Sequence, residues 1–497
     1  MLKHRLRRVA AALLLCAVLS CSLSGTASAA GFRDVPTGHW AAAEISRCVE
    51  KGFFQGQSAE RFGLGQAMTR SAFAVVLCRF FGWDQTATGA APYTDIPSGA
   101  WYAGAIDAAY THGAITRQDK QFRPGDPITR EELTVMLLRA LGYSTLSGLA
   151  ETLSHPFTDV STSEGYITLA HDMGLMNGTA ATTFAPDRHA TREQVAVILM
   201  RLYDKLHQDN SLRLAVVTDA EEIPSLQNLD AVAIPALRLI GAGGAKLTPD
   251  VLDETAAAAV RDAAKNAGTK AILYVTGGPS ALNSSVDETA RLLVSAVRDG
   301  GYDGLFLDIP ARKTDGGLVA LTKKLDTALQ DKLLYLAAEP PVWRGTGYGG
   351  YLYTDLAKYA DRIFLRVDSY VEKSSPVAAP APPEDIYFAL QKLSSVPSGK
   401  LGLLLHSAAN NWQNGVVTGT LSYEAVSSML TEKGVESHYS DRYAGAYLMR
   451  GTAQAVWYLT DESVAQRVQL LRLFGADALC LSDLGSVSTD VLAALGQ

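Results

Sequence analysis

The sequence predicts a multidomain chain, in which an all-α domain made of three repeats is followed by an α/β domain of the (β/α)8 TIM-barrel class. The first observation is a set of motifs that recurs three times between residues 32 and 205. The second is a change of pattern after a short polar linker at 207–212. From 213 to 497, apolar strand-like runs alternate with helical segments, as in parallel α/β folds. A chain of 497 residues, 47 % of them hydrophobic, can form more than one core.

Residues 1–29 are expected to be a signal peptide. Four basic residues precede an apolar run at 9–19, which is too short to cross a bilayer, and small residues at 27–29 supply a cleavage site. A lipoprotein modified at Cys21 is the second interpretation, because residues 18–21 loosely fit a lipobox. No later segment is long and apolar enough to span a membrane, so the mature protein is expected to be secreted.

The three repeats, expected at 30–88, 89–150 and 151–206, carry the same signals in the same order. Each opens with an aromatic residue two positions before an aspartate, and these aspartates are 61 and 64 residues apart. Each closes with a threonine and an arginine before an apolar-periodic run, the pattern of an N-capped helix. The matched positions are Asp34, Asp95 and Asp159 at the opening, Trp40, Trp101 and Tyr166 after it, and Arg70, Arg130 and Arg192 at the closing helix.

This pattern resembles S-layer homology domains, whose three repeats form a pseudo-threefold helical prism. The resemblance implies non-covalent binding of a pyruvylated secondary cell-wall polysaccharide of Gram-positive bacteria, through the aspartates, tryptophans and arginines at the matched positions. An arginine beside a helix N-terminus offers charged and backbone donors to a ketal carboxylate, and Trp40 and Trp101 offer flat faces to sugar rings. The alternative is that the arginines are only surface charges beside helix caps.

The barrel is predicted from its eight strand-like runs, which helical segments separate over about 285 residues, close to the roughly 250 of a typical barrel. The alternative, an open doubly wound sheet, would be expected to carry a glycine-rich phosphate-binding loop after its first strand. Residues 217–220 do not form such a loop. The runs are 214–217, 231–235, 271–275, 304–309, 333–337, 362–367, 401–405 and 478–481, with helices at 249–267, 286–299 and 318–329 among them.

Acidic and aromatic residues collect at the predicted C-terminal strand ends, where barrel enzymes place their chemistry. Asp308, Glu339 and Asp368 end the fourth, fifth and sixth strands. Trp343 and Trp412, in later loops, offer stacking surfaces for sugar rings. Any single acid at such a place can instead cap a helix or face water.

Residues 303–310 resemble the fourth-strand signature of glycoside hydrolase family 18, Asp-Gly-x-x-x-Asp-x-Glu. Residues 455–477 resemble the run into the eighth strand of family-18 proteins associated with spore germination. In that family, the glutamate protonates the glycosidic oxygen and the adjacent aspartate positions the N-acetyl group of the substrate. Here Pro310 stands at the glutamate position, Val367 at a tyrosine position and Ser482 at a tryptophan position.

A proline can neither donate nor accept a proton, and a general acid contributes about 10²–10⁴-fold to the rate. The sequence therefore predicts a cell-wall-anchored surface protein with a catalytically inactive barrel that binds peptidoglycan or a chitin-like glycan. The first alternative is an active wall glycosidase that uses Glu339 or Asp308 as its acid. The second is a structural surface protein whose barrel binds no sugar.

Charge and cysteine content limit the other classes. A formal net charge of −7 and a pI near 5.8 give no reason to expect a nucleic-acid partner. Cys48, Cys78 and Cys480 remain after signal removal, and their spacing fits no metal site, so no metal or cofactor is predicted. We expect buried free thiols, with pairing of Cys48 and Cys78 as the alternative.

Overall fold

A computed structural model describes residues 31–86, 89, 91–97, 99–116, 120–208, 211–241, 244–311, 316–341, 351–367 and 379–495. The predicted signal peptide, Trp343 and Asp368 lie outside these residues. The chain forms two compact units, residues 1–207 and 208–497, which divide within the predicted linker. Each unit is described by itself.

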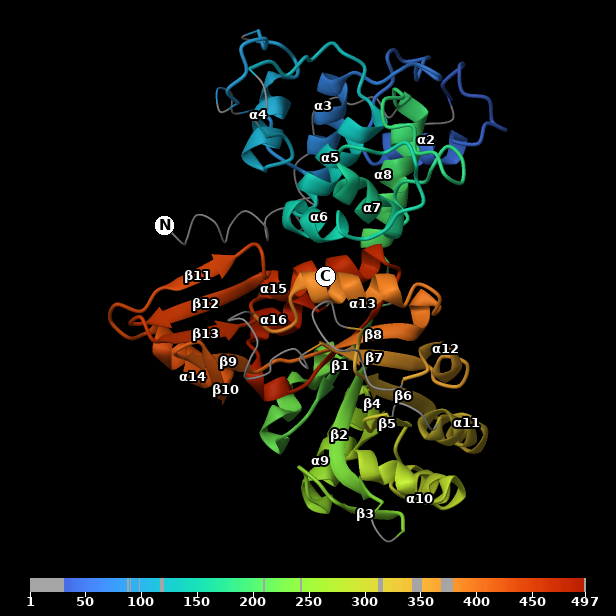
Figure 1. Cartoon of the computed structure of the whole chain (residues 1–497), viewed down its shortest axis with the longest axis vertical. Helices are drawn as coiled ribbons and strands as arrows, with labels where there is room; N and C mark the ends of the chain where they lie inside the picture. The colour runs from blue at the N-terminus through green and yellow to red at the C-terminus, as the bar shows by residue number, and fades with distance from the viewer. Residues whose placement is uncertain are drawn as a thin grey trace. The chain divides into compact units, whose positions relative to one another are not determined.

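The N-terminal unit is helical (Figure 1). Its helices are α2 (Ala42–Glu50), α3 (Arg70–Phe81), α4 (Ala103–Thr111), α5 (Arg130–Ala140), α6 (Ser144–Ala150), α7 (Glu164–Asp172) and α8 (Arg192–Leu206). Helices α3, α5 and α8 begin at the three predicted arginines, each after an N-cap threonine. The side chain of Thr69 accepts from the N–H of Ala72, and Thr129 forms a capping box with Glu132. The predicted caps of α3 and α5 are therefore present.

A ring of backbone hydrogen bonds joins the three repeats at the residues that precede the N-caps. The N–H of Ile128 donates to the carbonyl of Met68 (2.8 Å), that of Ala190 to Ile128 (3.0 Å), and that of Met68 to Ala190 (2.9 Å). All three residues are at most 1 % exposed. Because the third bond returns to the first repeat, the three repeats are arranged around a pseudo-threefold axis.

The C-terminal unit is a closed barrel of eight parallel strands. Their order is β1-β14-β8-β7-β6-β5-β4-β2, and β1 pairs with both β14 and β2. The strands are β1 (Leu212–Val216), β2 (Ala231–Ile240), β4 (Lys270–Gly277), β5 (Gly304–Asp308), β6 (Leu333–Ala338), β7 (Arg362–Arg366), β8 (Leu401–Leu405) and β14 (Ala478–Leu481). Each coincides with a predicted run. A short strand, β3 (Lys246–Pro249), pairs with β2 in antiparallel orientation.

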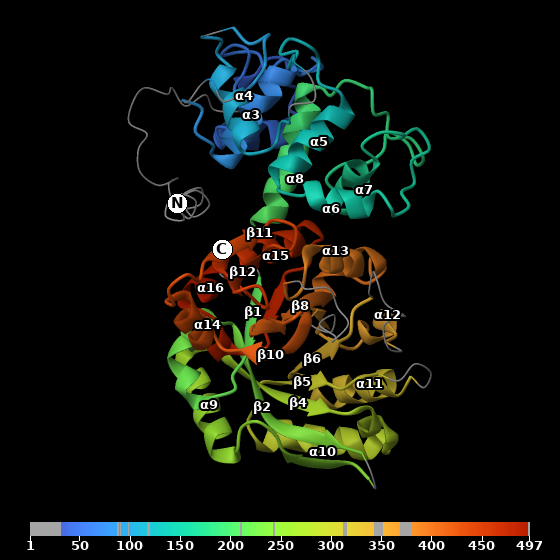
Figure 2. The same cartoon turned by 60° about the vertical axis from the view of Figure 1, so that its left-hand side comes forward.

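Alternate strand residues fill the barrel interior, as the two-residue period of a strand requires. The rings of Tyr274, Phe306, Tyr335 and Phe364 pack together there, with neighbouring centroids 5.0–6.0 Å apart. Helices lie outside the strands (Figure 2). They are α9 (Glu254–Ala267), α10 (Val286–Asp299), α11 (Gly317–Leu329), α12 (Tyr353–Leu356), α13 (Pro383–Lys392), α15 (Asp461–Leu473) and α16 (Thr489–Ala494).

A second, antiparallel sheet, which the sequence did not predict, lies between β8 and α15 in the chain. Its order is β10-β9-β13-β12-β11, and Val426 of α14 (Tyr423–Leu430) packs on one of its faces. The strands are β9 (Ala409–Gln413), β10 (Val416–Leu421), β11 (Ser437–Ser440), β12 (Gly445–Arg450) and β13 (Gln454–Tyr458). Arg467 of α15 is fully buried and donates to the carbonyls of Pro380 (2.7 Å) and Ala444 (2.6 Å), which ties this insertion to the barrel.

Candidate functional site

The three motif aspartates brace a loop of their own repeat. Each carboxylate accepts hydrogen bonds from backbone N–H groups at the loop phenylalanine and the residue after it. The donors are Phe62 and Gly63 to Asp34 (2.8 and 2.7 Å), Phe122 and Arg123 to Asp95 (2.8 and 2.7 Å), and Phe184 and Ala185 to Asp159 (2.8 and 2.7 Å). The N–H of Phe184 holds the pKa of Asp159 below its usual value.

The three motif arginines hold the same loops from the neighbouring repeat. In each case the Nε atom donates to the carbonyl of a loop phenylalanine, and the guanidinium lies 4.6–4.9 Å from the centre of that ring. The pairs are Arg70 with Phe122 (2.8 Å), Arg130 with Phe184 (2.9 Å) and Arg192 with Phe62 (2.8 Å). We call these contacts the first, second and third junctions. The arginines are therefore half-buried or buried bridges between repeats, and not the simple surface charges of the alternative interpretation.

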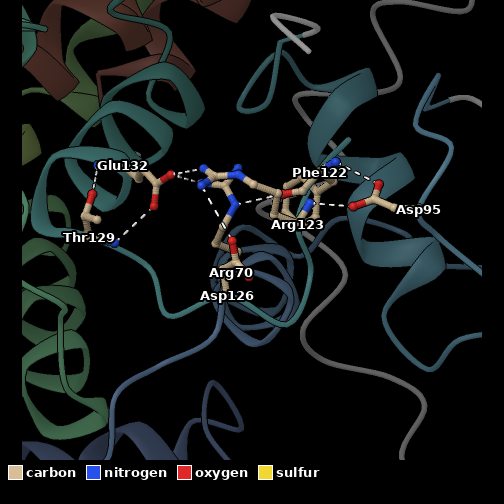
Figure 3. A network of polar contacts seen from close by, with 7 residues as sticks. All are labelled: Arg70, Asp95, Phe122, Arg123, Asp126, Thr129 and Glu132. Carbon is tan, nitrogen blue, oxygen red and sulfur yellow. Dashed lines mark hydrogen bonds and ion pairs between the residues drawn. The ribbon is translucent and has the colours of Figure 1, made fainter. Parts of the chain in front are cut away.

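The first junction contains a carboxylate that neutralises its arginine (Figure 3). Nη1 of Arg70 lies 2.6 Å from Oε1 of Glu132, which also pairs with Arg123. The other carboxylate oxygen of Glu132 accepts from the backbone N–H of Thr129 at 3.1 Å. At the second and third junctions, Nη2 of the arginine donates instead to a neutral carbonyl, from Arg130 to Asn177 (2.7 Å) and from Arg192 to Gln55 (2.8 Å).

Two of the three predicted aromatic positions face solvent. Trp40 is 61 % exposed and Trp101 is 69 % exposed, so each indole presents a face to which a sugar ring could pack. Tyr166, at the third position, is half-buried and accepts a hydrogen bond from Nε of Arg139 at 3.1 Å.

In the barrel, Asp308 lies at the C-terminal end of β5 and is bound by side chains from two other strands. Its carboxylate forms an ion pair with Arg366 of β7 and accepts a hydrogen bond from the hydroxyl of Tyr274 on β4. The Asp308 side chain is only 13 % exposed. Pro310, two residues further, is half-buried.

Glu339 follows β6 and is half-buried. The hydroxyl of Tyr353 donates to its main-chain carbonyl, which fixes the backbone at this strand end. Its carboxylate makes no hydrogen bond or ion pair with any residue that the structure describes. Among the described residues, the Glu339 side chain therefore makes no direct polar contact with Asp308.

The sequence identifies Asp483 as an acid that follows the eighth strand, but the sequence interpretation missed Glu222, which lies near it at the same end of the barrel. Glu222, in the 3-10 helix after β1, accepts from the N–H and the hydroxyl of Thr218 (3.2 Å each). The Thr218 hydroxyl also lies 3.0 Å from Oδ1 of Asp483, which follows β14. Burial, and then the charge of Asp483, raise the pKa of Glu222 to about 7. The sequence signal that could have identified Glu222 is its position four residues after Thr218, which follows the first strand.

Trp412 has a different setting from the one expected. It is 1 % exposed and packs with Trp457 and Ala379 against one face of the small sheet, so its ring belongs to a core and not to an open stacking surface. The three cysteines are free and buried, as expected. Burial raises the pKa of the thiols of Cys48 and Cys78 to about 12.

Among the described residues, no cluster of three or more histidine, cysteine, aspartate or glutamate side chains suited to a metal ion occurs. No helix in the described part of the chain has the length and apolar character needed to cross a membrane.

Two family models match the chain. The model of the S-layer homology domain matches residues 31–74, 92–134 and 156–196, which are the three repeats. The model of glycosyl hydrolases family 18 matches residues 237–474, which lie within the barrel unit.

Curated relatives share only part of the chain. An amylopullulanase of Thermoanaerobacterium thermosulfurigenes is 32 % identical over 35 % of this chain and 10 % of its own length. An S-layer protein of Bacillus thuringiensis subsp. finitimus is 24 % identical over 39 % of this chain and 24 % of its own length. The chain thus spans a quarter or less of either relative.

Solved structures share the fold of the barrel unit. A chitinase from Chromobacterium violaceum superposes with a TM-score of 0.53 at 16 % identity, covering 58 % of this chain and 98 % of the chitinase. The spore cortex-lytic enzyme SleL of Bacillus megaterium superposes with a TM-score of 0.50 at 16 % identity, covering 66 % of this chain and 80 % of that enzyme.

Proposed function

Because the chain carries three S-layer homology domains and a glycosyl hydrolase family 18 domain, we propose that it is a cell-wall-attached surface protein with a non-hydrolytic barrel. The repeats hold a pyruvylated secondary polysaccharide of a Gram-positive-type wall. The barrel binds a chitin-like glycan or peptidoglycan without cleaving it.

The attachment rests on the repeats. Their three junctions place arginines between repeats, and Trp40 and Trp101 lie open to solvent. Cations and exposed indoles together suit an acidic polysaccharide, because the cations pair with its carboxylates and the indoles pack against its sugar rings.

The proposed absence of hydrolysis rests on one observation at the end of β5. Asp308 is engaged by two other side chains, and Pro310 stands where the family has its acid. The family's proton donor is replaced by a residue without a titratable group. The remaining aspartate is paired with Arg366 and hydrogen-bonded by Tyr274, so it cannot take over the role of the acid without breaking both contacts.

The test uses the full chain with chitooligosaccharides and with purified peptidoglycan, and measures products by mass spectrometry and binding by calorimetry. We expect binding without products. Products that disappear in Glu339→Gln or Asp308→Asn would overturn the non-hydrolytic barrel.

A separate experiment tests the attachment. The chain is expected to sediment with native walls, but not with walls stripped of secondary polysaccharide.

A second candidate is hydrolysis by Glu222. A carboxyl group with a pKa of about 7 is about half protonated at neutral pH, so part of it can act as a general acid, and Asp483 supplies a neighbouring carboxylate. Turnover that is lost in Glu222→Gln, but kept in Glu339→Gln, would favour this candidate over the non-hydrolytic barrel.

A further inference from the structure

The small antiparallel sheet has two edges, which differ in how well they are shielded. Its strand order is β10-β9-β13-β12-β11, so β10 and β11 are the outer strands (Figure 1). Among the described residues, β10 pairs with β9 alone and β11 pairs with β12 alone. The outward backbone groups of an edge strand can pair with a strand of another chain, and proteins usually prevent this with charged residues, proline or a very short strand.

The strands β11 and β3 carry such devices. β11 is four residues long, and the charged residues Glu436 and Asp441 flank it. β3, beside β2 at the edge of the barrel sheet, also has four residues, of which Lys246 is the first and Pro249 the last. These two edges are therefore poor partners for a further strand.

β10 has neither charge, nor proline, nor unusual shortness. It is six residues long, Val-Val-Thr-Gly-Thr-Leu, and no residue from 407 to 423 is charged or is a proline. Most of its side chains are exposed. Val416, at its start, is 44 % exposed, and Tyr423, just after its end, is 41 % exposed. Valine and threonine favour extended strands, so this edge is suited to accept another strand.

The turn before β10 determines which of its backbone groups face outward. Asn414 and Gly415 both have positive φ angles (51° and 77°), as in the two-residue turns of β-hairpins, and the turn closes on Gln413 and Val416. Such a turn closes on a pair that exchanges both hydrogen bonds, and the next pair along the strands exchanges none. The N–H and carbonyl of Val417 are therefore directed away from β9, toward the open edge.

A bulge limits the length of this edge. The register with β9 shifts between Val417 and Gly419, and the hydroxyl of Thr418, which lies between them, donates to the carbonyl of Asn411 at 3.2 Å. A bulge bends an edge strand and opposes extended pairing. The edge therefore suits a short joint with one partner strand and not a long ladder.

We infer that β10 pairs in antiparallel orientation with β10 of a second copy of this chain, around a twofold axis, and joins the two small sheets into one. Because β3 and β11 are shielded, the matching edge for β10 is another β10. An uncharged strand meets its own copy without like-charge repulsion. Each copy offers one such edge among its described strands, so the assembly closes at two chains. The pairing is independent of the proposed wall attachment and of the chemistry of the barrel.

Sedimentation equilibrium of the full chain over a range of concentrations tests the pairing. The joint is small, so a weak dimer that dissociates on dilution is expected. Val416→Lys/Thr420→Lys should raise the dissociation constant of the dimer about tenfold or more, because four ammonium groups then meet along the joint. Glu436→Lys, beside β11, also adds two positive charges and is the matched control, for which an unchanged dissociation constant is expected. Circular dichroism shows whether each variant folds.

Hydrogen exchange gives a second measurement that needs no variant. The amide of Val417 should exchange more slowly at a high concentration of the unmodified chain than at a low one, whereas the amides of β11 should exchange equally at both. A chain that stays monomeric, or a dimer that Val416→Lys/Thr420→Lys leaves intact, would exclude this interface. Assemblies that grow beyond two chains would contradict the closed pair. An equal effect of Glu436→Lys would mean that net charge, and not the β10 edge, controls association.

Discussion

Asp308 of β5 and Arg366 of β7 form an ion pair at the C-terminal end of the barrel, where the family signature would place a proton donor two residues later. The side chains are 13 % and 24 % exposed, so the pair is only partly hydrated. Phe306, two residues before Asp308 on the same strand, packs with Phe364 in the interior. An ion pair and apolar packing thus hold the strand end at which the family signature has an acid.

We predict that Arg366→Met lowers the free energy of unfolding of the barrel by about 2–4 kcal/mol, because it leaves the Asp308 carboxylate partly buried and unpaired. The double variant Asp308→Asn/Arg366→Met should recover much of this loss. Urea unfolding, monitored through hydrogen exchange of the backbone amides in β5 and β7, measures the change in the free energy of unfolding. Additive losses in the double variant would contradict a coupled pair.

We predict a pH dependence of barrel stability that arises from Glu222. Its pKa is raised from 4.5 to about 7 in the folded chain, so its stabilising contribution is complete below pH 4.5 and is lost as the pH rises to 7. Glu222→Gln mimics the protonated form. Allowing for its partial exposure, this variant should be more stable than the unmodified chain by about 2 kcal/mol at pH 8.

Thermal unfolding at pH 4 and pH 8 checks this prediction. The two proteins should unfold at similar temperatures at pH 4 and at different temperatures at pH 8. A constant difference across the range would show that Glu222 does not titrate in this window.

We predict that Asp34→Asn destabilises the N-terminal unit by about 2 kcal/mol, because its carboxylate accepts from three backbone N–H groups, those of Phe62, Gly63 and Leu64. An asparagine has one carbonyl oxygen and places an amide donor against one of these donors. Asp187→Asn, at an exposed aspartate, is the control and should have little effect. Guanidinium unfolding of both variants compares them directly.

We predict that Trp40→Ala and Trp101→Ala together reduce retention on native cell walls without lowering stability. The two indoles are 61 % and 69 % exposed, so their removal leaves no buried cavity. Co-sedimentation with walls measures retention, and circular dichroism measures the unfolding temperature. Full retention by the double variant would mean that these rings do not contact the polysaccharide.

Much of the fold could be predicted because local signals coincide with it. Each of the eight barrel strands is an apolar run that is buried on both faces, as parallel strands are. The helices that close the repeats begin at the predicted threonines, because capping is a short-range interaction. The small antiparallel sheet was missed because strands such as β9 and β11 are short and polar and lack a clear two-residue alternation.

The site could be predicted less well, because side-chain partners depend on contacts between distant segments. The sequence identified Arg130 but could not show that it bridges to Phe184, 54 residues away. It could not show that Trp412 is covered. Glu222 was missed because its pKa is raised by burial and then by the charge of Asp483, which lies at the far end of the barrel sequence, and neither effect can be recognised from the residues around Glu222.

The ring of hydrogen bonds through Met68, Ile128 and Ala190 makes the repeat domain differ from a linear array. In a linear solenoid, loss of a terminal repeat removes one interface, so stability falls stepwise with length. In this closed arrangement, loss of any repeat removes two of the three junctions and leaves unpaired backbone groups at a buried centre. A substitution that alters the charge of a single junction, such as one at Glu132, leaves this ring intact, whereas a change in the number of repeats breaks it.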